Sequence, residues 1–193
     1  MLALVDGNNF YVSCERIFNP SLENKPTAVL SNNDGCIISS SSELKALQVK
    51  MGTPYYQIKD LIPKHGIQVL SSNYTLYSDI SNRFMSILKN FGSQQEVYSI
   101  DESFLDLSGI SNLNSYGHKI KDTVKQYIGL PVCVGMAETK VLAKFANYLA
   151  KKYKGLYGVC SLSELGESRV NKAMEMLNKI YHLINDIYNR KIP

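Results

Sequence analysis

The sequence lacks the cysteine and histidine patterns of zinc sites and disulfide frameworks. Its four cysteines stand far apart without a C-x-x-C pair, and its three histidines are scattered rather than held at ligand spacing. This absence argues against a zinc site and favours reduced, buried cysteines in a cytoplasmic protein. The residues concerned are Cys14, Cys36, Cys133, Cys160, His65, His118 and His182.

Long apolar runs, internal repeats and low-complexity segments are also missing. The apolar opening "MLALV" meets Asp6 at once, and no later run approaches the roughly 18 apolar residues of a membrane span. We therefore expect no membrane segment and no export signal. With 45% hydrophobic and 20% charged residues among 193, the composition predicts a folded protein with one sizeable core or two small domains.

Apolar spacing and turn residues predict strands that alternate with helices. The run from Leu2 to Val5 reads as a buried strand that delivers Asp6 to the sheet edge, and "VCVGMA" reads as another. Helical spacing covers residues 74–91 and 116–128, which end before Gly92 and Gly129. The sequence thus predicts an α+β fold with a mixed or antiparallel sheet that helices cover on one side.

A β-hairpin with a short helix is predicted between the first strand and the first long helix. The segment "TAVLSNNDGCIIS" joins two β-rich runs through Asn-Asp-Gly, a typical hairpin turn. Ser40 and Glu43 have the spacing of a capping box for a helix over "ELKALQ". This unit has the character of a small insertion.

The net charge of +4 and the pI of about 8.7 lean basic, which favours an acidic partner such as nucleic acid without requiring one. A helix predicted from Thr139 places apolar residues on one side and, within a narrow arc on the other, Lys140, Lys144, Asn147 and Lys151. Such a stripe is either an ordinary solvated face or a phosphate-binding surface, and charge pattern alone does not separate the two.

The stretch "YSIDESFLDL" places Asp101 and Glu102 side by side within a predicted β-hairpin. A solvated turn is the simple interpretation. A metal site is the alternative, and Asp6 at the end of the first strand is the candidate third carboxylate. Oxygen ligands without histidine or cysteine favour Mg²⁺, and the chemistry would then be metal-assisted phosphoryl or nucleotidyl transfer.

Six segments, in this order and spacing, resemble Y-family translesion DNA polymerases. They are "VDGNNFYVSCE", "VLSNNDGC", "ELKALQVKMGTP", "SSNYTLYSDIS", "YSIDESFLDLSG" and "VGMAETKVLAKFANYLAKK". They look most similar to the UmuC branch, which supplies the catalytic subunit of bacterial DNA polymerase V. The resemblance implies a palm formed by residues 1–10 and 74–165, with a fingers subdomain at residues 11–73.

The resemblance implies roles for individual residues. Asp6, Asp101, Glu102 and the carbonyl of Gly7 would bind two Mg²⁺ ions. Tyr11 would be the steric gate beneath the nucleotide sugar, although an ordinary core tyrosine is its structural alternative. Triphosphate contacts would come from Lys45 and Lys151, and DNA contacts from Lys140, Lys144 and Lys152. Ser42 stands where many family members carry a phosphate-contacting tyrosine, which puts one triphosphate contact in doubt.

The implied activity is template-directed DNA synthesis of the translesion, SOS-repair type. The substrates would be primer–template DNA and dNTP, and family analogy adds a UmuD′-type accessory subunit, a recombinase filament and a sliding clamp. A non-catalytic remnant that competes with the full-length polymerase for DNA or partners is the alternative. A palm-type nucleotidyl cyclase would explain the acids but neither the fingers insertion nor Tyr11.

The resemblance stops near Leu165. The family continues into a thumb and a little finger, which we do not expect in residues 166–193. That segment predicts one divergent amphipathic helix instead, with an apolar stripe at Val170, Met174, Leu177, Tyr181, Ile184 and Tyr188. Because the thumb and little finger supply most of the duplex grip in this family, we expect weak polymerase activity.

Overall fold

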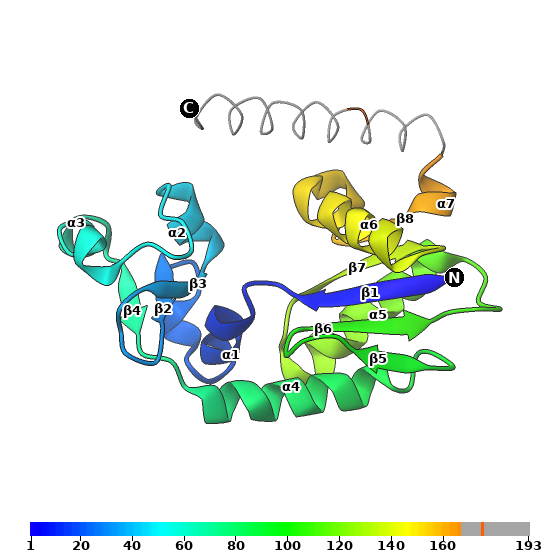
Figure 1. Ribbon diagram of the computed structural model, residues 1–193, viewed down its shortest axis with the longest axis horizontal. Coiled ribbons are helices and arrows are strands. Elements are labelled where there is room, and N and C mark those ends of the chain that lie inside the picture. The colour runs from blue at the N-terminus through cyan, green and yellow to red at the C-terminus, as the bar shows by residue number, and fades with distance from the viewer. Residues whose placement is uncertain (167–174, 176–193) are drawn as a thin grey trace, which may run out of the picture.

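The computed structural model describes residues 1–166 and Glu175 (Figure 1). The predicted helix over residues 166–193, with its apolar stripe, lies almost entirely outside these residues. Two sheets form the framework, one of five strands and one of three. In Figure 1 they lie on opposite sides of the molecule, the smaller at the left and the larger at the right, and α1 and α4 bridge them.

The larger sheet has the strand order β5-β6-β1-β7-β8. Its central strand β1 (Leu2–Gly7) runs antiparallel to both neighbours, β6 (Glu102–Asp106) and β7 (Val132–Ala137). Strand β5 (Gln95–Val97) pairs antiparallel with β6, whereas β8 (Val159–Ser161) pairs parallel with β7. The sheet is therefore mixed, as predicted.

Helices cover both faces of this sheet, so the one-sided covering predicted from the sequence is wrong. Residues alternate along β1: Ala3 and Val5 belong to the core beneath α4 (Tyr74–Leu88) and α5 (Leu113–Ile128), while Leu4 packs with Ala143 of α6 (Lys140–Lys152). A continuous apolar strand fits this two-sided burial.

Gly135 in β7 allows α6 to lie close to the sheet. A Cβ at this position would stand 2.1 Å from the backbone nitrogen of Asn147 and 2.5 Å from the carbonyl oxygen of Ala143. Asn147 itself is buried, and its side-chain amide donates to the carbonyl oxygens of Leu4 (3.3 Å) and Cys133 (3.0 Å). Its predicted place in the solvent-facing lysine stripe is therefore wrong.

The smaller sheet has the order β3-β2-β4 and its own apolar core. The predicted hairpin is present as β2 (Thr27–Leu30) and β3 (Ile37–Ser40), and β4 (Gln68–Leu70) pairs parallel with β2. Helices α1, η1, α2, η2 and α3 surround it, with the bounds Phe10–Phe18, Pro20–Leu22, Ser42–Ala46, Tyr55–Ile58 and Leu61–His65.

Three predicted boundaries need correction. Helix α2 is capped by Ser41, whose Oγ accepts from the Leu44 amide at 3.2 Å, whereas the expected cap Ser40 is buried in β3. Helix α4 ends at Leu88, before the predicted Phe91, and α5 begins three residues before Tyr116.

After α6 come η3 (Lys154–Leu156), β8 and α7 (Leu162–Leu165). Within residues 1–166, no helix has the length and apolar character needed to cross a membrane.

Candidate active site

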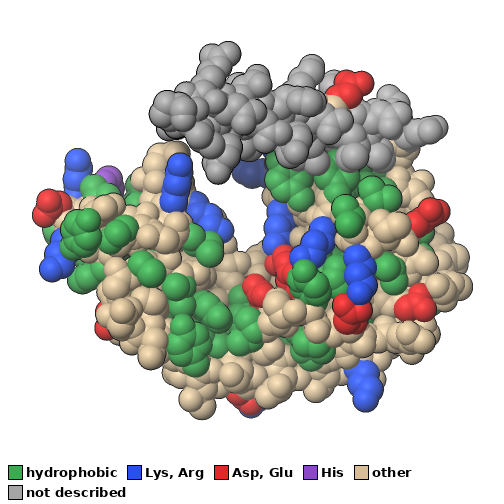
Figure 2. Space-filling view, viewed as in Figure 1, with side chains coloured by type: hydrophobic (Ala, Val, Ile, Leu, Met, Phe, Trp, Pro, Cys, Tyr) green, Lys and Arg blue, Asp and Glu red, His purple; other side chains and the backbone are tan. Residues whose placement is uncertain are grey.

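An open cavity of about 850 Å³ lies between the end of β1, the start of α1, helix α2 and the C-terminal end of α6. Figure 2 shows lysine or arginine side chains on both sides of the hollow between α2 and α6, with acidic side chains at its floor. Six residues predicted from the sequence line it: Asp6, Gly7, Tyr11, Lys45, Asp101 and Lys151. Segments that are far apart in the chain therefore meet in one place.

The three predicted acids lie close in the fold but do not all point together. Asp6 and Glu102 are direct partners across the antiparallel pair of β1 and β6. The carbonyl oxygen of Asp101 accepts from the Gly7 amide at 2.9 Å, while its Oδ1 accepts from the Ser99 hydroxyl at 2.7 Å. Within residues 1–166, no three acidic, histidine or cysteine side chains converge as a ready metal-ligand group.

Lysines of α6 contact two of these acids. Lys151 Nζ lies 2.6 Å from Asp6 Oδ1, and Lys144 Nζ lies 3.3 Å from Glu102 Oε2. Burial raises the pKa of Asp6 to about 6 against the opposing charge of Lys151, and the Glu102 carboxylate adds to the increase. The positive charge of Lys151 thus offsets only part of the free-energy cost of burying the ionised Asp6 carboxylate.

Lys45 reaches the cavity from α2. Its ammonium donates to Asn9 Oδ1 in the turn between β1 and α1. Burial lowers the pKa of Lys45, and the nearby charge of Lys151 acts in the same direction. Two lysines from different helices therefore face one another across this cavity, an arrangement that suits a polyanion. Ser42, the first residue of α2, also lines it.

Tyr11 belongs to a cluster of three tyrosines. Its ring stacks on that of the fully buried Tyr77, with a centroid distance of 4.4 Å, and meets Tyr74 edge-on at 6.1 Å. The Tyr77 hydroxyl donates to Glu15 Oε1 at 2.8 Å, which fixes the ring beneath Tyr11. Tyr11 therefore presents a supported aromatic face at the cavity wall.

The other two predicted DNA contacts, Lys140 and Lys152, pair with groups other than Asp6, Asp101 and Glu102. Lys140 Nζ contacts both carboxylate oxygens of Glu96, at 2.6 and 2.7 Å. Lys152 donates to the hydroxyl of Tyr148 at 3.0 Å. Both lysines lie at the exposed surface of α6.

Several residues of the site were not singled out from the sequence. Asn9 and Lys154 line the cavity, and Ser99 holds the Asp101 carboxylate. The "DGNN" turn is the signal that could have identified Asn9, because asparagine tolerates the left-handed backbone that Asn9 adopts with φ 48°. Nothing in the local pattern identified Ser99 or Lys154.

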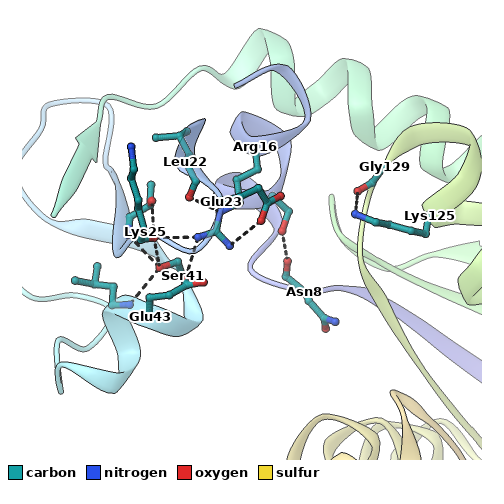
Figure 3. A network of polar contacts seen from close by, with 12 residues as sticks. Asn8, Arg16, Leu22, Glu23, Lys25, Ser41, Glu43, Lys125 and Gly129 are labelled. Carbon is teal, nitrogen blue, oxygen red and sulfur yellow. Dashed lines mark hydrogen bonds and ion pairs between the residues drawn. The ribbon is translucent and has the colours of Figure 1, made fainter. Parts of the chain in front are cut away.

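A second polar network joins α1 to the smaller sheet (Figure 3). The mostly buried guanidinium of Arg16 contacts Glu43 Oε2 at 2.9 Å and donates to the carbonyl oxygens of Lys25 (2.9 Å) and Leu22 (3.1 Å). Because Glu43 belongs to α2, this network fixes the helix that carries Lys45 against the helix that carries Tyr11.

This mixed sheet, with acids on two neighbouring strands and helices on both faces, has the fold of solved Y-family DNA polymerases. A solved structure described as an insertion ternary complex of Dbh DNA polymerase matches with a TM-score of 0.74 and 27% identity. That match covers 83% of this chain and 48% of the Dbh chain.

The chain belongs to the impB/mucB/samB family, whose sequence profile matches residues 5–148. It is 44% identical over 177 residues to Protein ImpB and 46% identical over 173 residues to Protein UmuC, both of Salmonella typhimurium. These matches cover 90% and 88% of this chain but only 42% and 41% of the relatives. The chain thus spans about two fifths of their length, and the resemblance to the UmuC branch is confirmed.

Proposed function

We propose that this chain carries the catalytic palm and the fingers of a UmuC-type translesion DNA polymerase, which adds a deoxynucleotide to a primer 3′-hydroxyl. The observation that carries the proposal is the pairing of Asp6 with Glu102 across β1 and β6, beside a cavity that also holds Tyr11, Lys45 and Lys151. The subdomains would be a palm of residues 1–10 and 74–165 and fingers of residues 11–73.

The donor set fits Mg²⁺. The candidate ligands are all oxygens, namely the carboxylates of Asp6, Asp101 and Glu102 with the carbonyl of Gly7, and such hard donors favour Mg²⁺ over zinc. The pairing of Asp6 with Glu102 across β1 and β6 supports this assignment, because a bound cation stabilises two neighbouring carboxylates. Two bound Mg²⁺ ions would activate the primer hydroxyl and stabilise the leaving pyrophosphate.

The chain's other residues would orient the substrates. Lys45 and Lys151 face one another at the cavity and would neutralise triphosphate charge. Tyr11, held from behind by Tyr77, would pack beneath the sugar and exclude a 2′-hydroxyl. Lys140, Lys144 and Lys152 would contact DNA phosphates. By family analogy, a UmuD′-type subunit, a recombinase filament and a sliding clamp would be its partners.

Single-nucleotide incorporation on a primed template, with Mg²⁺ and protein in excess over DNA, tests this proposal. Asp6→Asn keeps the side-chain size but removes the charge, so incorporation should fall at least 100-fold, which is about 3 kcal/mol of transition-state stabilisation. Asp122→Asn is the matched control, because Asp122 is exposed on α5. Asp101→Asn should resemble Asp6→Asn, and Glu102→Gln should lose less. Primer binding without incorporation by the unaltered chain would instead support a non-catalytic competitor.

A further inference from the structure

The two acids that face one another across β1 and β6 already carry cationic partners. Lys151 contacts Asp6 and Lys144 contacts Glu102, and both lysines come from the same helix. They are seven residues apart, which is about two turns or roughly 10 Å along α6, so both point to one side of the helix. Helix α6 therefore supplies one ammonium group to each acid of the pair.

Each contact occupies one oxygen of its acid, Asp6 Oδ1 or Glu102 Oε2, at the carboxylate that a metal ion would use. A Mg²⁺ ion about 2.1 Å from a carboxylate oxygen that lies 2.6 Å from an ammonium group would repel that ammonium group and favour its displacement. Asp6 lines the open cavity and the Glu102 side chain is 23% exposed, while the side chains of Lys144 and Lys151 are 42% and 40% exposed. The ammonium groups therefore have room to leave.

Lysine suits an exchangeable contact better than arginine does. Its charge sits at the end of a flexible four-carbon stem and lacks the rigid two-point geometry of a guanidinium group. Lys144 also has a second resting place, because its Nζ lies 4.0 Å from the centre of the Tyr98 ring. An ammonium group displaced from Glu102 would keep this cation–π contact with no movement of α6.

Resting on the function proposed above, we propose that Lys144 and Lys151 are placeholder cations that hold Glu102 and Asp6 in the metal-free protein and compete with the divalent metal for them. Metal binding then releases two ammonium groups on one side of α6, one of them at the cavity. Each released group becomes available to a phosphate at the moment the metal arrives. The lysines therefore lower the intrinsic metal affinity and couple metal binding to phosphate binding.

Mn²⁺ binding to the full chain without DNA or nucleotide, followed by electron paramagnetic resonance, tests the competition directly. Ion pairs whose lysines are partly exposed correspond to an affinity change of about two- to fivefold, so Lys144→Gln and Lys151→Gln should each bind Mn²⁺ about two- to fivefold more tightly. Lys154→Gln is the matched control. Lys154 lines the same cavity, and no carboxylate of the described residues pairs with it. The Lys154→Gln substitution removes the same charge but does not remove the ion-pair partner of Asp6 or Glu102.

A double-mutant cycle identifies the acid through which Lys144 acts. If Lys144 competes through Glu102, Lys144→Gln should no longer tighten Mn²⁺ binding in a Glu102→Gln background. Equal Mn²⁺ affinity for Lys144→Gln, Lys151→Gln and Lys154→Gln would overturn the placeholder role and leave the polymerase assignment standing. Unchanged Mn²⁺ affinity in Asp6→Asn would instead remove the metal site and, with it, both proposals.

Discussion

The position of the Tyr11 ring depends on the side chains that pack against it. The ring is partly buried and stacks on Tyr77, which Glu15 holds through a hydrogen bond. If its face lies beneath the sugar, Tyr11→Ala should raise ribonucleotide use relative to deoxyribonucleotide use by about 10- to 200-fold, the range expected when one steric contact is removed. Steady-state incorporation of rNTP and dNTP opposite the same template base measures this ratio.

Tyr56→Ala provides the comparison, because Tyr56 is 68% exposed and belongs to η2 rather than to the cavity wall. Its ratio should match that of the unaltered chain. A Tyr11→Ala ratio equal to that of Tyr56→Ala would return Tyr11 to an ordinary structural role.

Asp6 gives a prediction about pH. Burial raises its pKa from 3.8 to about 6, so the folded protein holds a proton there that the unfolded chain has already lost. The metal-free protein should therefore lose stability as the pH rises from about 4 to 6 and stay level above that, by on the order of 3 kcal/mol. Urea unfolding in a metal chelator at pH 4, 5, 6 and 8 measures this change.

Asp6→Asn should lose that pH dependence, because an amide does not titrate, and should become more stable than the unaltered chain at pH 8. Mg²⁺ should oppose the loss at high pH by binding the ionised carboxylate. Parallel pH profiles for Asp6→Asn and the unaltered protein would contradict the assignment to Asp6.

The elements differed in how well the sequence predicted them. Apolar runs identified β1 and β7, and the Asn-Asp-Gly turn identified the hairpin of β2 and β3, because these signals are local. The meeting of Asp6 with Glu102 was anticipated because strands of one sheet share an edge. The covering of the second face by α6 was missed, since it depends on the strand order and on the close approach at Gly135.

The lysine stripe shows the same limit. Helical spacing placed Lys140, Lys144 and Lys151 on one side of α6, but it could not supply their partners, which come from β5, β6 and β1. Asn147 has the same spacing as these lysines and is nevertheless buried, because its amide satisfies two strand carbonyl oxygens. Helical spacing therefore assigned Asn147, a buried polar residue, to the surface.

The contact between β7 and α6 can be tested through Gly135. A methyl group there would overlap the backbone of Ala143 and Asn147, so Gly135→Ala should force α6 outward and cost at least about 2 kcal/mol of unfolding free energy. Gly155→Ala is the control, since nothing lies within 4 Å of its added Cβ. Chemical denaturation of both variants measures the difference, and equal stabilities would contradict the close packing.

At the scale of the whole molecule, the part of the chain that the structure describes offers few contacts for a nucleic acid duplex. Our candidates are Lys140, Lys144, Lys151 and Lys152, and the first three also have carboxylate partners. With about −0.9 per phosphate contact, the logarithm of the DNA affinity should fall with the logarithm of salt concentration with a slope no steeper than about −4. Fluorescence anisotropy of a labelled primer–template between 25 and 200 mM salt gives this slope.

A fusion experiment tests duplex binding and chemistry separately. A thumb and little finger from a related polymerase, joined after Leu165, should convert single-nucleotide addition into multi-nucleotide extension, because only residence time on the primer would change. A fusion that bound DNA tightly and remained inert, or processive synthesis by the unfused chain, would rule out this division between site and grip.

The turn that follows β1 has a consequence for protein engineering. Asp6 and Tyr11 are five residues apart, and Asn9 between them has a left-handed backbone and accepts a hydrogen bond from Lys45. A library that randomises this turn to broaden nucleotide choice would also disturb the carboxylate and the lysine contact. Designers should therefore keep Asn8 and Asn9 fixed and vary Tyr11 together with Tyr74 and Tyr77, whose rings surround it from a different helix.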